Sequence, residues 1–185
     1  MNAQDLKNSI LQLAIQGKLV EQRKEEGTAK ELIKQIEAEK KQLIKESKIK
    51  KQKELPEIKV DEIPFDIPES WEWVRLGDTL DIARGGSPRP IKAFITDSED
   101  GVNWIKIGDT DKGGKYINST NEKIIKEGMK KSRFVKRGDF LLSNSMSFGR
   151  PYILNIEGCI HDGWLVLSQV VEVFNKDFLY YLLSS

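Results

Sequence analysis

The sequence predicts an α+β fold, in which a globular domain of mixed strands and short helices follows an N-terminal helical arm. The first 60 residues are dominated by Lys, Glu and Gln, whereas Trp, Phe, Ile, Val and Gly become frequent from Trp71 onward. Short apolar runs then alternate with Gly turns and short helical patterns, which is typical of mixed domains. The 185 residues suffice for one globular domain and an appendage.

The arm begins with an amphipathic helix over residues 3–16. Apolar side chains recur there at helical spacing, and Gly17 ends the pattern. These side chains are Leu6, Ile10, Leu13 and Ile15, widened by Leu11 and Ala14. The sequence therefore predicts a helix with one apolar face.

A second helix is expected to open at Thr28, where Thr28 and Glu31 fit a capping box. Its apolar positions form a narrow heptad-like seam, which needs another helix to cover it. The seam consists of Ala29, Leu32, Ile36 and Leu43, with Ile33 beside it. We therefore expect residues 1–54 to form a helical hairpin or coiled coil.

The end of the arm is strongly basic. Residues 40–53 hold seven Lys and one Glu. Such a run is either a solvated helix face or a surface that contacts DNA phosphates. Pro56, Pro64 and Pro68 then predict an extended linker over residues 55–70.

The globular part is expected from Trp71 to the end of the chain. Alternating residues at 71–75 favour a strand, and a helical turn capped by Asp78 is expected at 79–82. Ser119 and Glu122 fit a capping box for a helix reaching Met129. Further strands are expected at 102–107, 115–118, 139–145, 151–156 and 163–173, and a terminal helix from Asp177.

Composition excludes several classes of protein. The single cysteine, Cys159, excludes a disulfide framework, and a chain with one Cys and one His is not expected to hold a structural zinc site. Cys159 is expected in the core. No apolar run approaches the length that spans a membrane, so the cytoplasm is the expected compartment. The net charge of +1 is not typical of a nucleic-acid binder, although residues 1–60 alone carry 14 Lys and Arg against 10 Asp and Glu.

The sequence contains no complete motif for catalysis. Residues 108–116 resemble a phosphate-binding loop, but Lys115 is one position late and Tyr116 replaces the Ser or Thr that holds magnesium. His161 and Asp162 have no nucleophile pattern nearby, which favours a structural histidine. We therefore predict that the chain is not an enzyme and holds no cofactor or metal of its own.

Three segments could instead bind DNA. Residues 84–92 hold three cations and no acid among Gly and Pro residues, residues 123–137 carry seven cations against one acid, and residues 143–151 are rich in Ser with one Asn and one Arg. Arg and Asn suit base edges, and Lys suits phosphates. The alternatives are an ordinary turn, a solvated helix face and a capped turn, respectively.

A family resemblance covers most of the chain. Trp73–Asp78 leading into Arg84–Pro88, Ile125–Met129 leading into Ser132, and Gly138–Ser143 leading into Gly149 resemble the target-recognition domain of type I restriction–modification specificity subunits. Leu6–Val20 resembles the start of many such subunits. Each motif is loose, but their order and spacing agree with the family.

The resemblance implies a non-catalytic subunit that recognises one half of a split site on double-stranded DNA. Its implied partners are methyltransferase subunits, which use S-adenosylmethionine, and motor-nuclease subunits, which use ATP and Mg. Long helices in the family act as spacers and dock the methyltransferase. The alternative is an assembly fragment that docks a methyltransferase through its helices without recognising DNA.

The resemblance also implies which loops contact DNA, namely 84–92 and 143–150. Together with the basic segment, they give the residues that we predict to bind DNA: Arg84, Ser87, Arg89, Lys92, Lys130, Lys131, Arg133, Ser143, Asn144, Ser145, Ser147 and Arg150.

The chain departs from the family in length. We expect an arm at 1–54, a linker at 55–70 and a recognition domain at 71–185 that is truncated at its C-terminus. Complete specificity subunits have a second recognition domain and a second spacer, which are missing here. A homodimer of such half-subunits would restore two recognition domains.

Overall fold

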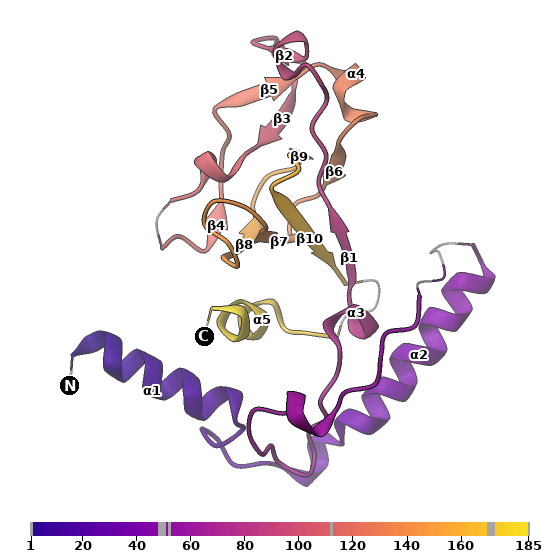
Figure 1. Ribbon diagram of the computed structural model, residues 1–185, viewed down its shortest axis with the longest axis vertical. Helices are drawn as coiled ribbons and strands as arrows, with labels where there is room; N and C mark the ends of the chain where they lie inside the picture. Colours follow the sequence, from indigo (N-terminus) through magenta and orange to yellow (C-terminus); the bar gives the residue numbers. More distant parts are fainter. Residues whose placement is uncertain (1, 48–50, 52, 112, 170–172, 185) are drawn as a thin grey trace. The chain divides into compact units, whose positions relative to one another are not determined.

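The chain folds as two compact units in a computed structural model, which describes residues 2–47, 51, 53–111, 113–169 and 173–184. Unit 1 comprises residues 1–80 and 169–183, and unit 2 comprises residues 81–168 (Figure 1). The recognition domain was expected from Trp71 onward, and unit 2 begins at Asp81. The C-terminal helix, expected in the recognition domain, belongs to the unit that holds the N-terminal arm.

Helices dominate unit 1. They are α1 (Ala3–Ile15), α2 (Ala29–Lys45), α3 (Leu76–Thr79) and α5 (Lys176–Leu183), with 3-10 turns η1 (Lys24–Glu26) and η2 (Val60–Glu62). The expected capping box of α2 is confirmed, because Thr28 and Glu31 each accept from the backbone amide of the other. The two N-terminal helices predicted from the apolar spacing are thus present.

The hairpin expected between α1 and α2 is not formed in the described residues. The two helices diverge in Figure 1, and α1 contacts α5 instead. Only Ile36 of the predicted seam is fully buried, while Leu32 is 41% exposed. α2 associates with the segment before α3, where the amide of Ala29 donates to the carbonyl of Ser70 at 2.8 Å. The basic run at 40–53 leaves the helix at Lys45, and its residues 48–50 and 52 lie outside the described residues.

The strand predicted at residues 71–75 is wrong. This segment is an irregular stretch that is fixed by its aromatic side chains. The indole of Trp71 donates to Gln22 Oε1 at 2.9 Å, and Trp73 packs edge-on against Phe65 at 5.2 Å between ring centroids. The alternation of Trp residues therefore marks two tertiary contacts and not the two faces of a strand.

An arginine clamp holds the linker at 55–70. Arg75 donates two hydrogen bonds of 2.7 Å to the carboxylate of Glu62 and further bonds to the carbonyls of Pro56 and Glu57. The bidentate bond lowers the pKa of Glu62 to about 2. The linker predicted from its prolines is therefore extended but attached along its length.

The described residues of unit 2 form ten short strands in two five-stranded sheets. The first sheet has the order β1-β10-β7-β8-β4 and the second β2-β5-β3-β9-β6. Their bounds are β1 (Asp81–Arg84), β2 (Ile95–Thr96), β3 (Val102–Ile105), β4 (Tyr116–Ile117), β5 (Glu122–Ile124), β6 (Arg133–Val135), β7 (Phe140–Ser143), β8 (Pro151–Leu154), β9 (Gly158–Ile160) and β10 (Trp164–Ser168). Together with the helices, they confirm the predicted α+β class.

Alternation along β3 and β9 directs neighbouring residues into two different hydrophobic clusters of unit 2. Trp104 pairs with Cys159, and Ile105 pairs with Ile160, in the parallel register of β3 and β9. Because neighbouring side chains point to opposite faces of a sheet, the Ile pair enters the main cluster and the other pair enters a second one. The expected burial of Cys159 is confirmed, because it is fully buried.

Two helical segments that we predicted in or next to unit 2 are replaced in part by strands. The helix predicted from Ser119 to Met129 is instead β5 followed by α4 (Lys126–Met129). The turn predicted at 79–82 is shifted into α3 and β1. In both places the residues complete a sheet, and tertiary pairing overrides the local capping signal.

Both ends of unit 2 meet at one pair of strands. Asp81 opens β1 and Ser168 closes β10, and these two residues are partners in the antiparallel register. The chain therefore enters and leaves unit 2 at adjacent positions.

Among the side chains of the main cluster, Trp164 is expected to contribute most to the free energy of unfolding. Its indole is fully buried, donates to the carbonyl of Ile105 at 3.2 Å and packs edge-on against Tyr152. Trp164→Ala should lower the free energy of unfolding by about 3–5 kcal/mol in urea titrations. Phe148→Ala, which truncates a side chain that is 77% exposed, is the control and should change it by less than about 0.5 kcal/mol. Equal effects of the two changes would contradict this description of the core.

Candidate nucleic-acid interface

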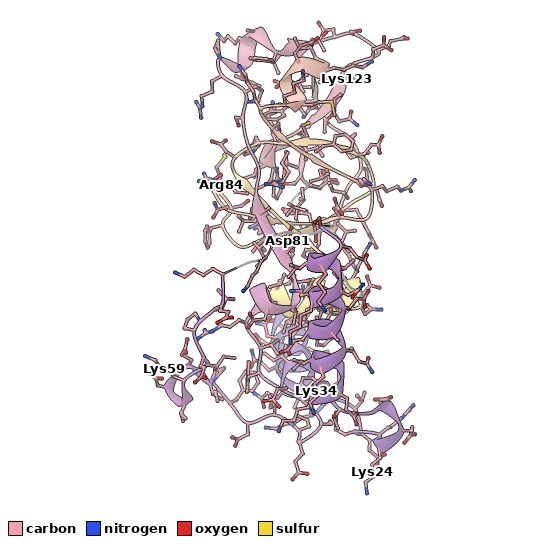
Figure 2. The ribbon with its side chains drawn as sticks, turned by 90° about the vertical axis from the view of Figure 1, so that its right-hand side faces the viewer. Lys24, Lys34, Lys59, Asp81, Arg84 and Lys123 are labelled. Carbon is pink, nitrogen blue, oxygen red and sulfur yellow. The ribbon has the colours of Figure 1, made fainter. Side chains whose placement is uncertain are left out.

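The loop at 84–92 begins where β1 ends and is fixed at once by backbone bonds. Figure 2 shows Arg84 at the end of β1, with Asp81 at its start. The amide of Gly85 donates to the carbonyl of Trp164 at 2.9 Å, and that of Gly86 to the carbonyl of Ile160 at 3.1 Å. A Cβ on Gly85 would overlap the carbonyl oxygen of His161. Glycine is therefore required where this loop passes the turn at 161–163.

Asp162 organises the side chains of the same loop. Its carboxylate accepts from the hydroxyl of Ser87 at 2.8 Å, and Arg89 Nη2 lies 3.4 Å from its other oxygen. Its carbonyl accepts from Arg84 Nε at 2.8 Å. The Ser87 hydrogen bond, ahead of the nearby charges, lowers the pKa of Asp162 below its ordinary value. One anionic side chain thus fixes the loop while Arg89 stays 80% exposed.

His161 is a structural residue of this turn. Its Nδ1 lies 2.7 Å from the amide nitrogen of Gly163, and its Nε2 lies 3.2 Å from that of Ile107. A neutral imidazole accepts from only one of these two amides, because its other nitrogen carries the proton, and a second proton would remove that remaining acceptor. Burial of the ring also lowers the pKa of His161. This geometry agrees with the structural interpretation of the histidine made from the sequence.

The basic segment at 123–137 contributes cations beside the loop. Lys130 and Lys131 follow α4 and are exposed, and the carbonyl of Lys131 lies against Gly86. Arg133, on β6, donates through Nε to the carbonyl of Arg84 at 2.9 Å. Residues from two distant parts of the chain therefore form one basic surface, which we call the cationic edge: Arg84, Arg89, Lys131 and Arg133.

Lys92 lies beside a hollow that opens next to this edge. It belongs to the 3-10 turn η3 (Ile91–Ala93). The hollow has a volume of about 990 Å³ and is bordered by residues 87–92 and by Trp104, Lys106, Glu122 and His161. Lys106 and Glu122 form an ion pair of 2.8 Å there. The surface beside the cationic edge is therefore concave.

The loop at 143–150 is held by its own first residue. Ser143 is buried, its hydroxyl donates to the carbonyl of Ser147, and its Oγ accepts from the amide of Arg150 at 2.9 Å. Ser143 is therefore unavailable for the DNA contact that we predicted for it. Asn144, Ser145 and Ser147 are half-buried, and Arg150 is exposed.

The turn at 161–163 connects the two loops. The amide of Asn144 donates to the carbonyl of Gly163 at 2.7 Å, while Asp162 binds Ser87 and Arg89. We did not predict a role for Asp162. The only indication in the sequence was the Asp-Gly dipeptide at 162–163, which is typical of a turn. Nothing in the sequence indicates that both loops rest on this turn, because 75 residues separate Asp162 from Ser87.

Metal and membrane sites are not found in the described residues. No group of His, Cys, Asp and Glu side chains among them could hold a metal ion. None of the helices in the described part of the chain is long and apolar enough to cross a membrane.

Comparison with known proteins supports the family resemblance over part of the chain. The specificity subunit of the type I restriction enzyme EcoAI from Escherichia coli is 55% identical over 80 residues, which are 43% of this chain and 14% of the relative. The EcoEI specificity subunit from the same organism is 52% identical over 84 residues, or 45% of this chain and 14% of the relative. No family model matches the chain.

Solved structures share the fold. The HsdS subunit from Thermoanaerobacter tengcongensis matches with a TM-score of 0.54 and 23% identity, over 65% of this chain and 29% of that chain. A chain from a structure of a type I restriction–modification system, described for its complex assembly and conformational transition, matches with a TM-score of 0.55 and 24% identity over the same shares. The fold is thus that of type I specificity subunits. The chain has homologues named as such subunits, and the aligned residues cover about one seventh of each curated relative.

The central position of Asp162 predicts a pH-dependent contribution to stability. Its pKa is lowered in the folded chain, so its stabilising effect is present above the pKa of the unfolded carboxyl and is lost as the pH falls through the folded value. Asp162→Asn should therefore reduce the melting temperature at pH 7, and its difference from the parent should shrink as the pH falls below the ordinary carboxyl pKa of 3.8. Asp139→Asn is the comparison variant. It removes a carboxylate that accepts from the backbone amide of Lys136, in a turn that is far from loop 84–92 in the sequence.

Proposed function

We propose that this chain is the DNA-recognition module of a type I restriction–modification complex and binds double-stranded DNA in a sequence-specific manner. The observation that carries the proposal is the turn at 161–163, which supports the cationic edge on one side and the polar loop at 143–150 on the other. Phosphate-binding and base-recognising chemistry are thereby combined on one surface.

Each part of the surface has a distinct role in the proposal. Lys130, Lys131 and Arg133 neutralise phosphates, and their contribution depends on salt because bound cations are released from DNA. Arg89 and Asn144 suit base edges, since Arg binds guanine and Asn binds adenine in bidentate fashion. Arg89 is highly exposed and only weakly bound to Asp162, so it can exchange that carboxylate for DNA.

The proposal includes the partners that the resemblance implies. The chain would direct methyltransferase subunits and motor-nuclease subunits to a DNA site, without taking part in their chemistry. S-adenosylmethionine, ATP and Mg would be bound by those subunits, and no cofactor is assigned to this chain.

The test is DNA binding as a function of salt. Fluorescence anisotropy with a labelled duplex should give weak binding by the chain alone, because a single recognition module buries about 600–1,000 Å². Addition of the methyltransferase should increase the affinity and make it sequence-selective. Salt-independent binding, equal with and without the methyltransferase, would favour the assembly fragment that recognises no DNA.

Substitutions in the two parts of the surface should have different consequences. Lys130→Ala with Lys131→Ala should weaken binding to all sequences and lower the salt slope by about one unit for each phosphate that is no longer neutralised. Arg89→Ala or Asn144→Ala should instead change the discrimination between sequences by about 1–3 kcal/mol per base contact. Mapping of methylated sites by the assembled complex measures this change, and an unaltered target in both variants would refute the assignment of bases to these residues.

α1 is proposed to contribute an assembly surface of unit 1. Its apolar face is open to solvent, with Leu6, Ile10 and Leu13 between 43% and 51% exposed. Such a stripe of apolar residues on a helix is typical of a contact with another helix. The helix that covers it would belong to the methyltransferase subunit or to a second copy of the chain.

Light scattering distinguishes these two partners. A dimer mass of the pure chain that Ile10→Glu converts to a monomer would assign the face to a second copy. A monomer that binds the methyltransferase, with binding abolished in Ile10→Glu, would assign it to that subunit. Lys7→Glu, on the same helix, is the matched control, and equal behaviour of both variants would contradict a role for the apolar face.

A further inference from the structure

Two large apolar side chains project from the tip of the loop between β7 and β8. Met146 is 89% exposed and Phe148 is 77% exposed. The other exposed large apolar residues of unit 2 in the described chain, namely Ile82, Tyr116 and Phe134, are 40–41% exposed. The tip is therefore far more open to water than any other apolar part of this unit that the structure describes.

Internal hydrogen bonds keep the tip in this position. The amide of Gly149 donates to the carbonyl of Ser143 at 2.8 Å, and the hydroxyl of Ser143 binds the carbonyl of Ser147. Met146 has φ of 57° and Gly149 has φ of 79°, both in the left-handed region. The loop is thus a closed turn that presents Met146 and Phe148 outward.

The surroundings of the tip indicate what covers these side chains. Asn144, at the base of the loop, binds Gly163, and the adjacent Asp162 holds the cations Arg84 and Arg89. Arg150 adds an exposed cation at the other end of the loop. An occupant that is anionic outside and apolar inside matches this arrangement, and duplex DNA with its stacked bases has that chemistry.

We propose that Met146 and Phe148 form an apolar wedge that enters between neighbouring base pairs of the duplex bound by the cationic edge. Phe and Met are among the side chains that unstack base steps in this way. The wedge would favour flexible pyrimidine–purine steps, since these cost less to deform. It would therefore contribute to target choice without a hydrogen bond to any base. The inference rests on the proposed function.

The experiment begins with a duplex selected from a random pool by the full chain, with the methyltransferase present if the chain alone selects none. Affinity is then measured at several salt concentrations for the parent, Met146→Ala and Phe148→Ala. Each variant should bind about tenfold more weakly, because Phe148→Ala removes the ring that stacks on a base and Met146→Ala removes the second apolar side chain of the wedge. The salt slope should stay unchanged, because every phosphate contact is retained.

Unwinding of DNA reports the wedge directly. Closed circular plasmid carrying the selected site is relaxed by a topoisomerase with the protein bound, and the change in linking number is measured. The parent should unwind the plasmid, Phe148→Ala should lose most of this effect, and Phe148→Trp should retain it. Tyr116→Ala, an exposed aromatic residue of the same unit, is the matched control and should behave as the parent.

The outcomes separate the wedge from the proposed function. If neither the chain nor its complex with the methyltransferase selects a duplex, the proposed function fails and the wedge with it. If the parent binds DNA and Phe148→Ala binds and unwinds it equally well, the wedge alone is overturned. It is also overturned if the variants bind DNA normally but no longer bind the methyltransferase, since the tip would then be a protein contact.

Discussion

The hydrogen bond between Ser87 and Asp162 is central to the arrangement of the surface that we propose to bind DNA. It joins the loop after β1 to the turn between β9 and β10, which are separated by most of unit 2 in the sequence. In the same turn, the carbonyl of Gly163 accepts a hydrogen bond from the backbone amide of Asn144, which begins the loop after β7. Together with the backbone bonds of Gly85 and Gly86, this bond holds the loop that carries Arg89 against the turn whose Gly163 carbonyl binds the backbone amide of Asn144.

The sheets explain why this turn is rigid enough for that role. β9 and β10 belong to different sheets, and the three residues between them follow a buried isoleucine and precede a buried tryptophan. A neutral His161 placed against two backbone amides fills the space between them. The loops at 84–92 and 143–150 are therefore attached to the core itself, as sites that need fixed geometry commonly are.

Local signals were sufficient for several parts of the fold. The apolar spacing of α1, the capping box of α2 and the apolar runs of β3, β7 and β8 predicted those elements correctly within a few residues. The strand predicted at 163–173 is present as β10 but ends at Ser168, and residues 170–172 lie outside the described residues. Each depends on residues close in sequence. The two residues of β2 and the three residues of β6 carry no such signal. These strands form because β5 and β9 offer them backbone partners.

In the candidate site, too, the sequence predicted only the features that depend on residues close together in the chain. The cations and polar residues at 84–92 and 143–150 were visible in the sequence, because their composition is unusual. Whether a hydroxyl faces solvent or the interior depends on tertiary contacts, and for this reason Ser143 was predicted as a contact residue although it closes its own loop. Asp162 was missed for the converse reason, since its partners lie far away in the sequence.

The adjacency of Asp81 and Ser168 has a consequence for how such a chain can change during evolution. Unit 1 is assembled from segments on both sides of unit 2, so the intervening 81–168 stretch is inserted into it as a cassette. The cassette begins and ends on neighbouring positions of one strand pair. Recombination at these two points could replace it with a stretch of different length and loop chemistry, because the gap to be bridged remains the width of one strand pair.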